Sequence, residues 1–220
     1  MIEVVIKVGG SLSRGGSKFR ELCLLLAELG RKRRLLVAPG GGPFADAVRD
    51  CDRLYGLSDA TSHWMAILAM DQLGFLLSDL IPESEPVRDA NAARETALAG
   101  RVPVLLPFNL LHRADPLPRS WAVTSDSISA WVAGYVGASG LILVKSTESL
   151  PDDADPARCD DGSPVPVTLE RLARWEGVDP YLAAVLTGSG LDFWIVNGNR
   201  PDRLRELLEK GSTRGAYLRR

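Results

Sequence analysis

Lys7-Val8-Gly9-Gly10-Ser11 closes the first apolar run of this chain, Ile2-Glu3-Val4-Val5-Ile6, and decides how it folds. A second run, Leu35-Leu36-Val37-Ala38, ends in the same manner at Pro39-Gly40-Gly41-Gly42-Pro43. Both runs have the length and apolar character of buried strands, and a helical pattern follows each glycine cluster. Backbone amides and helix N-termini therefore meet at one edge of the predicted sheet, where they favour negative charge. With Lys7 as a mobile cation at that edge, the sequence predicts a site for a polyphosphate.

Strand-like and helical patterns alternate along the rest of the chain. Helices are predicted at about 17–30, 44–54, 58–79 and 125–136 and from Pro201 onward, and strands at about 34–38, 101–106, 141–144 and 193–196, with an edge strand at 214–218. Apolar strands joined by helical crossovers are typical of a mainly parallel sheet covered on both faces. We expect an α/β fold in a single domain over 1–220, with its ligand beyond the carboxyl ends of the strands. The Asp- and Pro-rich stretch 151–166 is expected to be a mobile loop within that domain.

The composition excludes several kinds of partner. The 220 residues carry a formal net charge of −2 and are 45% hydrophobic, an ordinary mixture for a globular protein. The dense basic run Arg31-Lys32-Arg33-Arg34 follows a helical pattern and is typical of a solvated helix C-terminus, so no nucleic-acid site is predicted. No apolar run reaches the length of a membrane span. Cys23, Cys51 and Cys159 lack metal-binding spacing and are expected to be reduced thiols of a cytoplasmic protein.

Two well-known phosphate motifs do not fit this chain. The spacing from Gly10 to Gly15 is close to that of a P-loop, but position 16 is Gly where that motif has Lys. Gly40, Gly41 and Gly42 are contiguous, so the dinucleotide pattern Gly-x-Gly-x-x-Gly is not met either. A P-loop enzyme and a Rossmann-type NAD enzyme are both disfavoured.

The combination that remains resembles the amino acid kinase family, whose members include acetylglutamate, uridylate, carbamate and isopentenyl phosphate kinases. The resemblance rests on the two glycine-ended strands, on Ser125-Asp126-Ser127 opening a helix, and on Val196-Asn197-Gly198-Asn199-Arg200-Pro201 near the end, in the family's order. It implies a three-layer α/β/α sandwich with a mainly parallel central sheet. It also implies an ATP-dependent phosphotransferase that uses Mg²⁺, acts on a carboxylate, carbamate or phosphate, and forms a homo-oligomer.

A narrower resemblance is to one branch of that family, the [5-(aminomethyl)furan-3-yl]methyl phosphate kinases of methanofuran synthesis. It rests on residues 57–63 and 69–71, and above all on Ser120-Trp121-Ala122-Val123-Thr124-Ser125-Asp126-Ser127. It implies that a small phosphate monoester is phosphorylated to a diphosphate. Such an acceptor needs no strong general base, because a phosphate dianion is already nucleophilic near neutral pH. An alcohol acceptor would need a base, with His63 or Asp126 as the candidate.

The resemblance places several residues on the ATP side of the site. Lys7 matches the family's first lysine, which contacts the β- and γ-phosphates. Asp126 matches an aspartate that orients catalytic lysines or helps to hold the metal, although a helix N-cap would also explain it. Lys145 ends a buried strand and either contacts ATP phosphate or caps that strand. The residues expected to bring amides and close approach to the phosphates are Gly9, Gly10, Ser11, Gly40, Gly41 and Gly42.

Four residues are candidates for binding the acceptor. His63 and, more weakly, Arg49 are expected to bind its phosphate, because the resembled kinases take phosphorylated acceptors near this region; a structural histidine is the alternative. Asp71 is expected to pair locally or to contact an acceptor amine. Ser125 is expected to contact phosphate or to cap its helix. The sequence shows no set of metal ligands, so Mg²⁺ is expected to be held through the phosphates, with Asp126 as a further candidate.

Two departures from the family pattern bear on activity. The resembled branch has an Asp-x-Asp-Gly-like stretch where this chain has Lys145-Ser146-Thr147-Glu148, and the late lysine of acetylglutamate kinases has no counterpart in 177–182. Either Lys145 takes the place of the late lysine, or Mg²⁺ and Arg200 supply the charge. Two alternatives therefore stay open beside the furan phosphate kinase. One is a kinase for another small phosphate or carboxylate, and the other is a non-catalytic nucleotide- or oxyanion-binding protein.

Overall fold

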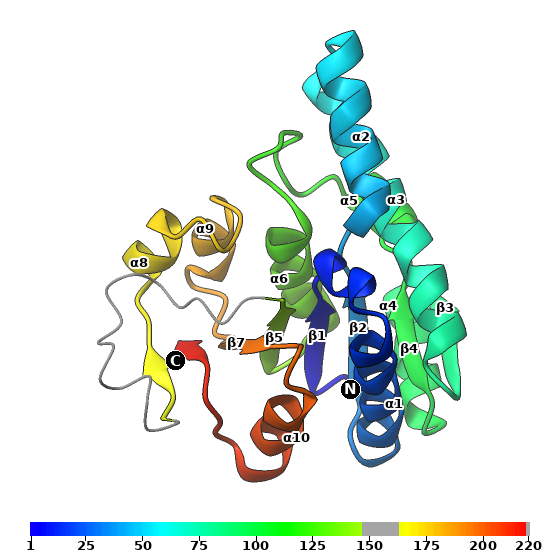
Figure 1. The fold of residues 1–220 in the computed structure, drawn as a ribbon, viewed down its shortest axis with the longest axis vertical. Helices are drawn as coiled ribbons and strands as arrows, with labels where there is room; N and C mark the ends of the chain where they lie inside the picture. Colours follow the sequence, from blue (N-terminus) through cyan, green and yellow to red (C-terminus); the bar gives the residue numbers. More distant parts are fainter. Residues whose placement is uncertain (147–162, 219–220) are drawn as a thin grey trace.

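The computed structural model describes residues 1–146 and 163–218, and a central sheet organises them. Within these residues the sheet has eight strands in the order β3-β4-β2-β1-β5-β7-β8-β6 (Figure 1). The strands are β1 (Val4–Val8), β2 (Leu35–Pro39), β3 (Ser84–Val87), β4 (Val102–Leu105), β5 (Gly140–Lys145), β6 (Val165–Pro166), β7 (Asp192–Asn197) and β8 (Ala216–Leu218). The described pairings are parallel except that of β7 with β8. The prediction of a mainly parallel sheet is confirmed.

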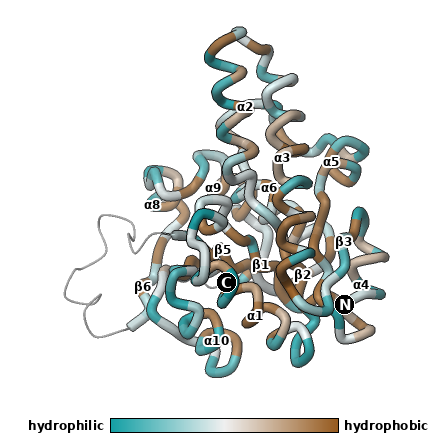
Figure 2. The backbone as a smooth tube through the Cα atoms, turned by 45° about the vertical axis from the view of Figure 1, so that its right-hand side comes forward, coloured by the Kyte–Doolittle hydropathy of each residue, from teal (hydrophilic) through white to brown (hydrophobic). Residues whose placement is uncertain are grey.

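Helices cover both faces of this sheet (Figure 1). The helices are η1 (Gly10–Gly15), α1 (Ser17–Lys32), α2 (Gly42–Tyr55), α3 (Asp59–Leu80), α4 (Ala90–Leu98), α5 (Phe108–Ala114), α6 (Ser125–Val136), α8 (Leu169–Arg174), α9 (Leu182–Leu186) and α10 (Pro201–Lys210). One core joins the sheet to α1 and α10, and the other joins it to α6 and α9. The central strands β1 and β2 consist mainly of apolar residues, drawn in brown in Figure 2. Apolar residues are expected there, because both faces of these strands are covered. The expected three-layer α/β/α sandwich is confirmed.

The pleat of the two central strands decides which layer each side chain enters. On β1, Ile6 belongs to the core under α1, whereas Val5 belongs to the core under α6. Successive side chains of a strand point to opposite faces, so Lys7 points toward α6. Lys145 has the same direction, because Val144 before it belongs to the core under α1. Since β1 and β5 are neighbours, the sheet brings two lysines from distant parts of the sequence onto one face.

Helices α2 and α3 form an antiparallel pair that projects beyond the carboxyl ends of the strands (Figure 1). The turn between them depends on Gly56, whose φ of +62° lies in the left-handed region that favours glycine. Ser58 then caps α3 by accepting the N–H of Thr61 at 3.3 Å. The pair forms one wall of the space above the glycine clusters.

Some elements differ from the prediction. The closing segment 214–218 was expected at an edge, but β8 lies between β7 and β6, so β6 is the outer strand on that side. The sequence patterns did not predict β3, α4, α5, α8 and α9, which are short. Residues 147–162 of the predicted loop 151–166 lie outside the described residues, and Val165–Pro166 at its end forms β6. A two-residue strand is too short to show any periodicity.

The structure also shows the surroundings of the basic run and of the cysteines, of which Cys23 and Cys51 are free thiols as expected. The basic run that ends α1 is solvated and paired, with Arg31 bound to Glu83 at 3.0 Å. Cys23 is buried, and this burial raises the pKa of its thiol to about 12. Cys159 lies outside the described residues. None of the helices that the structure describes is long and apolar enough to cross a membrane.

Candidate active site

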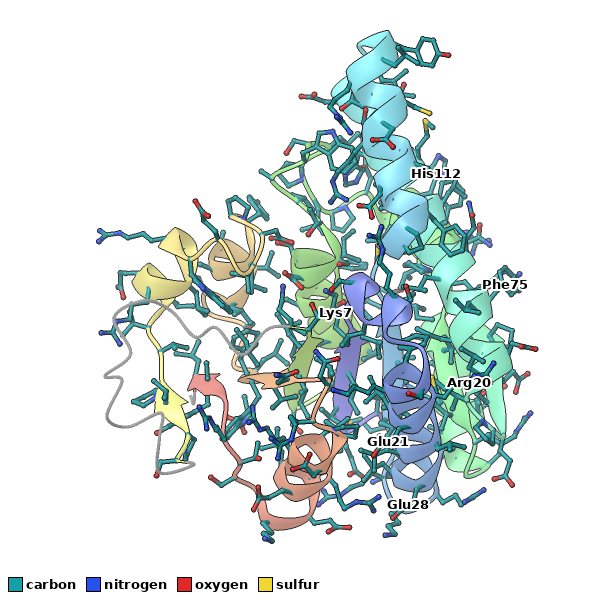
Figure 3. The ribbon with its side chains drawn as sticks, in the orientation of Figure 1. Lys7, Arg20, Glu21, Glu28, Phe75 and His112 are labelled. Atoms are coloured by element: carbon teal, nitrogen blue, oxygen red, sulfur yellow. The ribbon has the colours of Figure 1, made fainter. Side chains whose placement is uncertain are left out.

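Lys7 and Lys145 meet a single carboxylate, that of Asp126, at the carboxyl ends of β1 and β5. Lys7 Nζ donates to Asp126 Oδ1 at 2.8 Å, and Lys145 Nζ donates to Asp126 Oδ2 at 2.7 Å. Asp126 is the second residue of α6, the helix that covers the face into which both lysines point. Figure 3 shows Lys7 at the upper end of β1. Lys7 is only 4% exposed, so it is a fixed, paired cation and not the mobile one that the sequence suggested.

This lysine cluster (Lys7, Asp126 and Lys145) has one positive charge in excess, because one carboxylate serves two ammonium groups. Burial by itself would raise the pKa of Asp126, but the charges and hydrogen bonds of the two lysines lower it from 3.8 to about 2. Burial, together with the charge of Lys7, lowers the pKa of Lys145 below its ordinary 10.5, and Asp126 compensates only in part. Counted over these three residues the charge favours an incoming anion, and the nearby carboxylate of Asp179 offsets part of the excess at Lys145.

A second buried carboxylate, that of Asp179, holds the first turn of α6. It accepts the backbone N–H of Thr124 at 3.0 Å, that of Ser127 at 2.9 Å, and the hydroxyls of both residues. The Asp179 N–H in turn donates to Asp126 Oδ2 at 3.3 Å, and the Gly177 carbonyl accepts Lys145 Nζ at 2.5 Å. The sequence reasoning missed Asp179. From the sequence, the stretch 177–182 was notable only because it lacks the family's late lysine. No local pattern indicated that it would contact α6.

A pocket of about 300 Å³ lies at the same edge of the sheet. Its described lining includes Thr124 and Ser125, which precede Asp126, but not Lys7, Asp126 or Lys145 themselves. It is lined by the first residues of three helices: Gly10 and Ser11 of η1, Gly42 of α2 preceded by Gly41, and Ser125 of α6 preceded by Thr124. The first N–H groups of a helix have no acceptor within the helix, and they carry the positive end of its dipole. Several helix starts around one pocket make it an anion-binding space. The predicted residues Gly10, Ser11, Gly41, Gly42 and Ser125 are thus brought together.

Charged and aromatic side chains line the outer part of the pocket. Arg14 and Arg49 bind the two oxygens of Asp46, at 2.7 Å and 3.0 Å. The guanidinium of Arg49 also lies 5.0 Å from the ring centre of Trp121, whose indole N–H donates to Asp52 Oδ2 at 2.7 Å. Arg49 was predicted to lie here, but Arg14 and Asp46 were not. The spacing of Asp46 and Arg49 on α2 could have indicated an ion pair, since residues three apart are neighbours on a helix.

The glycine clusters differ in part from the prediction. The Gly9 N–H donates to the Val144 carbonyl at 2.8 Å and the Gly40 N–H to the Val8 carbonyl at 2.9 Å, so the sheet uses these two amides and they are not available to phosphate. A Cβ on Gly10 would lie 2.1 Å from the nitrogen of Gly42. The two clusters therefore pack backbone against backbone, and glycine is required for this close approach.

His63 and Asp71 are not among the described residues that line the pocket, and their contacts match the alternatives that the sequence left open, a structural histidine and a locally paired aspartate. His63 is buried with its ring 5.1 Å from that of Trp64, and burial lowers its pKa below 6.5. Asp71 follows the lining residue Met70 by one position, about 100° further around the helix. Its carboxylate accepts the Phe108 N–H at 3.1 Å and so caps α5, while burial raises its pKa. Both residues have local structural contacts.

The donor groups at this site do not form a protein-held metal centre. In residues 1–146 and 163–218, no group of three or more His, Cys, Asp or Glu side chains could hold a metal ion. Both oxygens of Asp126 accept ammonium groups, which is the geometry of the alternative in which this aspartate orients the two lysines. Arg200 is exposed and pairs with Asp202 at 3.4 Å, and no contact joins it to the lysine cluster within the described ranges.

Comparison with known proteins identifies the family. The sequence profile of the amino acid kinase family matches residues 3–174, which include β1, both glycine clusters, Asp126 and Lys145. The chain belongs to the amino acid kinase family. Its relatives within that family are kinases, so it is a phosphotransferase.

Three relatives of this amino acid kinase show how far the similarity extends. It is 25% identical to the [5-(aminomethyl)furan-3-yl]methyl phosphate kinase of Methanocaldococcus jannaschii over 93% of this chain and 92% of that protein. It is 24% identical to a uridylate kinase of Methanosarcina barkeri over 94% of this chain and 91% of that protein. The crystal structure of uridylate kinase from Archaeoglobus fulgidus has a TM-score of 0.71 at 19% identity, covering 98% of this chain and 99% of that one. The two sequence identities are nearly equal, so they do not decide the acceptor.

Proposed function

We propose that this amino acid kinase transfers the γ-phosphoryl group of ATP to a small phosphate monoester and so produces a diphosphate. The acceptor that we infer is [5-(aminomethyl)furan-3-yl]methyl phosphate, in methanofuran synthesis. The observation that carries this proposal is the buried lysine cluster beside a pocket lined by helix starts. Phosphoryl transfer requires alignment and neutralisation of charge more than covalent chemistry, and fixed cations beside backbone amides supply both.

The proposed reaction is a direct in-line transfer. An acceptor phosphate oxygen attacks the γ-phosphorus, and a new P–O bond forms as the bond to the β–γ bridging oxygen breaks. ADP leaves with that electron pair. Lys7 and Lys145 balance the charge of the migrating group while Asp126 fixes both ammonium groups. The acceptor needs no general base, because its phosphate is already largely ionised at neutral pH. With no set of carboxylate ligands among the described residues, Mg²⁺ is expected to arrive as part of the ATP substrate complex.

The lining of the pocket is consistent with a small, flat acceptor that carries a negative phosphate and a positive amine. Met70 and Trp121 offer apolar surface to a ring, and the helix starts offer N–H groups to its phosphate. Asp46 is the one carboxylate among the described lining residues, so it replaces Asp71 as the candidate for an acceptor amine. A furan that bears a phosphate ester and an aminomethyl group has each of these features. The volume of about 300 Å³ is at the small end of ligand sites.

Lys145 supports catalysis over simple binding. Its Nζ contacts Asp126 at 2.7 Å and the Gly177 carbonyl at 2.5 Å, within the stretch where the family's late lysine was sought. We therefore infer that Lys145 supplies the second catalytic cation, and that Arg200 does not. With both cations present, the absence of the late lysine no longer favours a non-catalytic binding protein.

A stripe on α3 supports self-association. Leu68, Phe75 and Leu76 are 42%, 50% and 37% exposed, and their spacing places them on one side of the helix. Figure 3 shows Phe75 pointing away from the sheet. We infer that this stripe contacts a second copy of the chain. Light scattering coupled to size exclusion should show that Phe75→Glu reduces the mass of the wild-type assembly, whereas a monomeric wild type would contradict the inference.

The identity of the acceptor is tested by measuring turnover with two alternative acceptors, each supplied separately. The purified protein is given ATP and Mg²⁺ with either [5-(aminomethyl)furan-3-yl]methyl phosphate or UMP, and ADP is measured together with the ³¹P signals of a new diphosphate. The expected result is ADP release that depends on the furan phosphate. Release with UMP alone, or none with either acceptor despite ATP binding, would overturn the proposal.

Two lysine variants provide the matched control for that assay. Lys7→Met should lower kcat by about 10²–10³-fold, because it removes one charge that stabilises the transition state. Lys18→Met changes an exposed lysine at the start of α1 and should leave kcat unchanged. Equal activity of the two variants would remove Lys7 from the mechanism.

A further inference from the structure

Asp179 is buried and ionisable, yet the proposed phosphoryl transfer makes no direct use of it. Its side chain is enclosed between the start of α6 and the chain before α9, and the residue is only 6% exposed. Isolated buried carboxylates are rare because their desolvation is costly, so this position must be compensated by its contacts. We propose that Asp179 is a positioning residue: it fixes the first turn of α6 so that Asp126 presents one oxygen to each catalytic lysine.

The contacts of Asp179 lie on both sides of Asp126. Thr124 is the N-cap residue of α6 and makes no capping hydrogen bond with its own side chain. Asp179 supplies that cap from another segment, since its carboxylate binds the N–H and hydroxyl groups of Thr124 and of Ser127. A carboxylate at a helix N-terminus is further stabilised by the helix dipole. The residues immediately around Asp126 are therefore clamped, and with them its side chain.

Asp179 also contacts the functional carboxylate itself. Its backbone N–H donates at 3.3 Å to Asp126 Oδ2, the same oxygen that binds Lys145. In the same short stretch, the Gly177 carbonyl holds the other side of Lys145 Nζ. The segment 177–179 thus fixes the second lysine and its counter-ion together. A shift of this segment would move both of them relative to Lys7.

The negative charge of Asp179 influences the protonation of the lysine cluster. The charged groups that face it are Asp126 on α6 and Lys145 on β5, with Lys7 on the far side of Asp126. Burial and the Asp126 charge raise the pKa of Asp179, against the donors from Ser127 and Thr124. Its negative charge in turn supports the protonated form of Lys145. Removing that charge while keeping the shape should lower the pKa of Lys145 further.

The first test is kinetic, and it rests on the proposed kinase function. Asp179→Asn should lower kcat by about 100-fold, the loss expected when a catalytic group is misplaced by about 1 Å, with KM for the acceptor unchanged. The alkaline limb of the kcat profile should move to lower pH, which a merely structural role would not cause. Asp179→Glu keeps the charge and should restore the position of that limb. Asp192→Asn serves as the control. It changes an exposed residue at the start of β7, at the edge of the sheet opposite to the site.

The second test needs no activity, so its failure is distinct from failure of the kinase proposal. The chain has five lysines, which allows each ¹³Cε-lysine NMR signal to be assigned by single Lys→Arg changes. In the ligand-free protein, Asp179→Asn should lower the titration midpoint of Lys145 and leave that of exposed Lys18 in place. If Asp179→Asn does not fold, Ser127→Ala removes one of the four donors and should move the Lys145 midpoint in the same direction through a displaced Asp126. An unchanged Lys145 midpoint in a folded variant would overturn the proposal.

Discussion

Replacing Asp126 by Asn would remove the carboxylate charge that binds both Lys7 and Lys145 while keeping the size of the side chain. In the wild type, Asp126 is 3% exposed and binds the two ammonium groups at 2.8 Å and 2.7 Å. Its pKa of about 2 against an ordinary 3.8 corresponds to about 2 kcal/mol of stability. The mutation costs more than this, because it takes from two buried ammonium groups the carboxylate that pairs directly with both. Breaking a buried ion pair from one side typically costs about 3–5 kcal/mol.

The assay is urea denaturation at neutral pH, followed by circular dichroism. For Asp126→Asn we expect a loss of about 3–5 kcal/mol in the free energy of unfolding, or roughly 6–20 °C in Tm for a chain of this size. The double variant Asp126→Asn/Lys145→Met should recover part of the loss, because it restores the net charge of the wild-type cluster. Activity should be absent from both. A free energy of unfolding within about 1 kcal/mol of the wild type for Asp126→Asn would refute the argument.

The same reasoning predicts a pH dependence of wild-type stability. The pKa of Asp126 is lowered in the folded state, so its contribution is complete above 3.8 and is lost as the pH falls toward about 2. Acid titration monitored by circular dichroism should therefore show a loss of stability in that window. The Asp126→Asn variant should lack this component, and an identical acid profile in both proteins would contradict the assignment.

Three further predictions concern two residues that line the pocket, Gly10 and Trp121, and the buried His63. Gly10→Ala should destabilise the protein and abolish turnover, since its Cβ would meet backbone at 2.1 Å, whereas Gly15→Ala has open space and should be tolerated in thermal melts. Trp121→Phe removes the indole N–H that binds Asp52, and calorimetry should show weaker acceptor binding with the ring surface retained. His63 has a lowered pKa, so it should contribute to a fall in stability as the pH drops below 6.5, and His63→Gln should flatten that slope in pH-dependent melts without changing KM. A raised KM in His63→Gln would instead return His63 to the acceptor site.

The chain's local patterns predicted most of the framework. Apolar runs that end in glycine gave β1 and β2, and the helical pattern from Ser125 to Val136 matches α6 at both ends. These elements are predictable because burial against neighbouring layers imposes a period on the sequence itself. The short β3 carries Ser84-Glu85-Pro86-Val87, which is mostly half-buried, so it shows no such period.

The candidate site was predictable only in part. The motifs pointed to Lys7 and Asp126 as site candidates, and Arg49 and Ser125, both predicted to bind the acceptor, line one pocket. The contact between Asp126 and Lys145 depends on β5 lying next to β1, which the chain order of the strands does not specify. For His63 the sequence predicted the helix but left its role open between an acceptor contact and a structural histidine, and only the fold shows that the side chain is buried beside Trp64.

By itself, then, the sequence determined an α/β sandwich with anion-binding helix starts at one edge of its sheet. This information is local, because strand and helix periods and glycine clusters are read within a few residues. Only the tertiary structure decided that the Gly9 and Gly40 amides belong to the sheet, and that Lys145 shares a carboxylate with Lys7. It also decided that Asp179 caps α6, across 52 residues of sequence. Such contacts are set by strand order, register and pleat, which place side chains together whatever their distance along the chain.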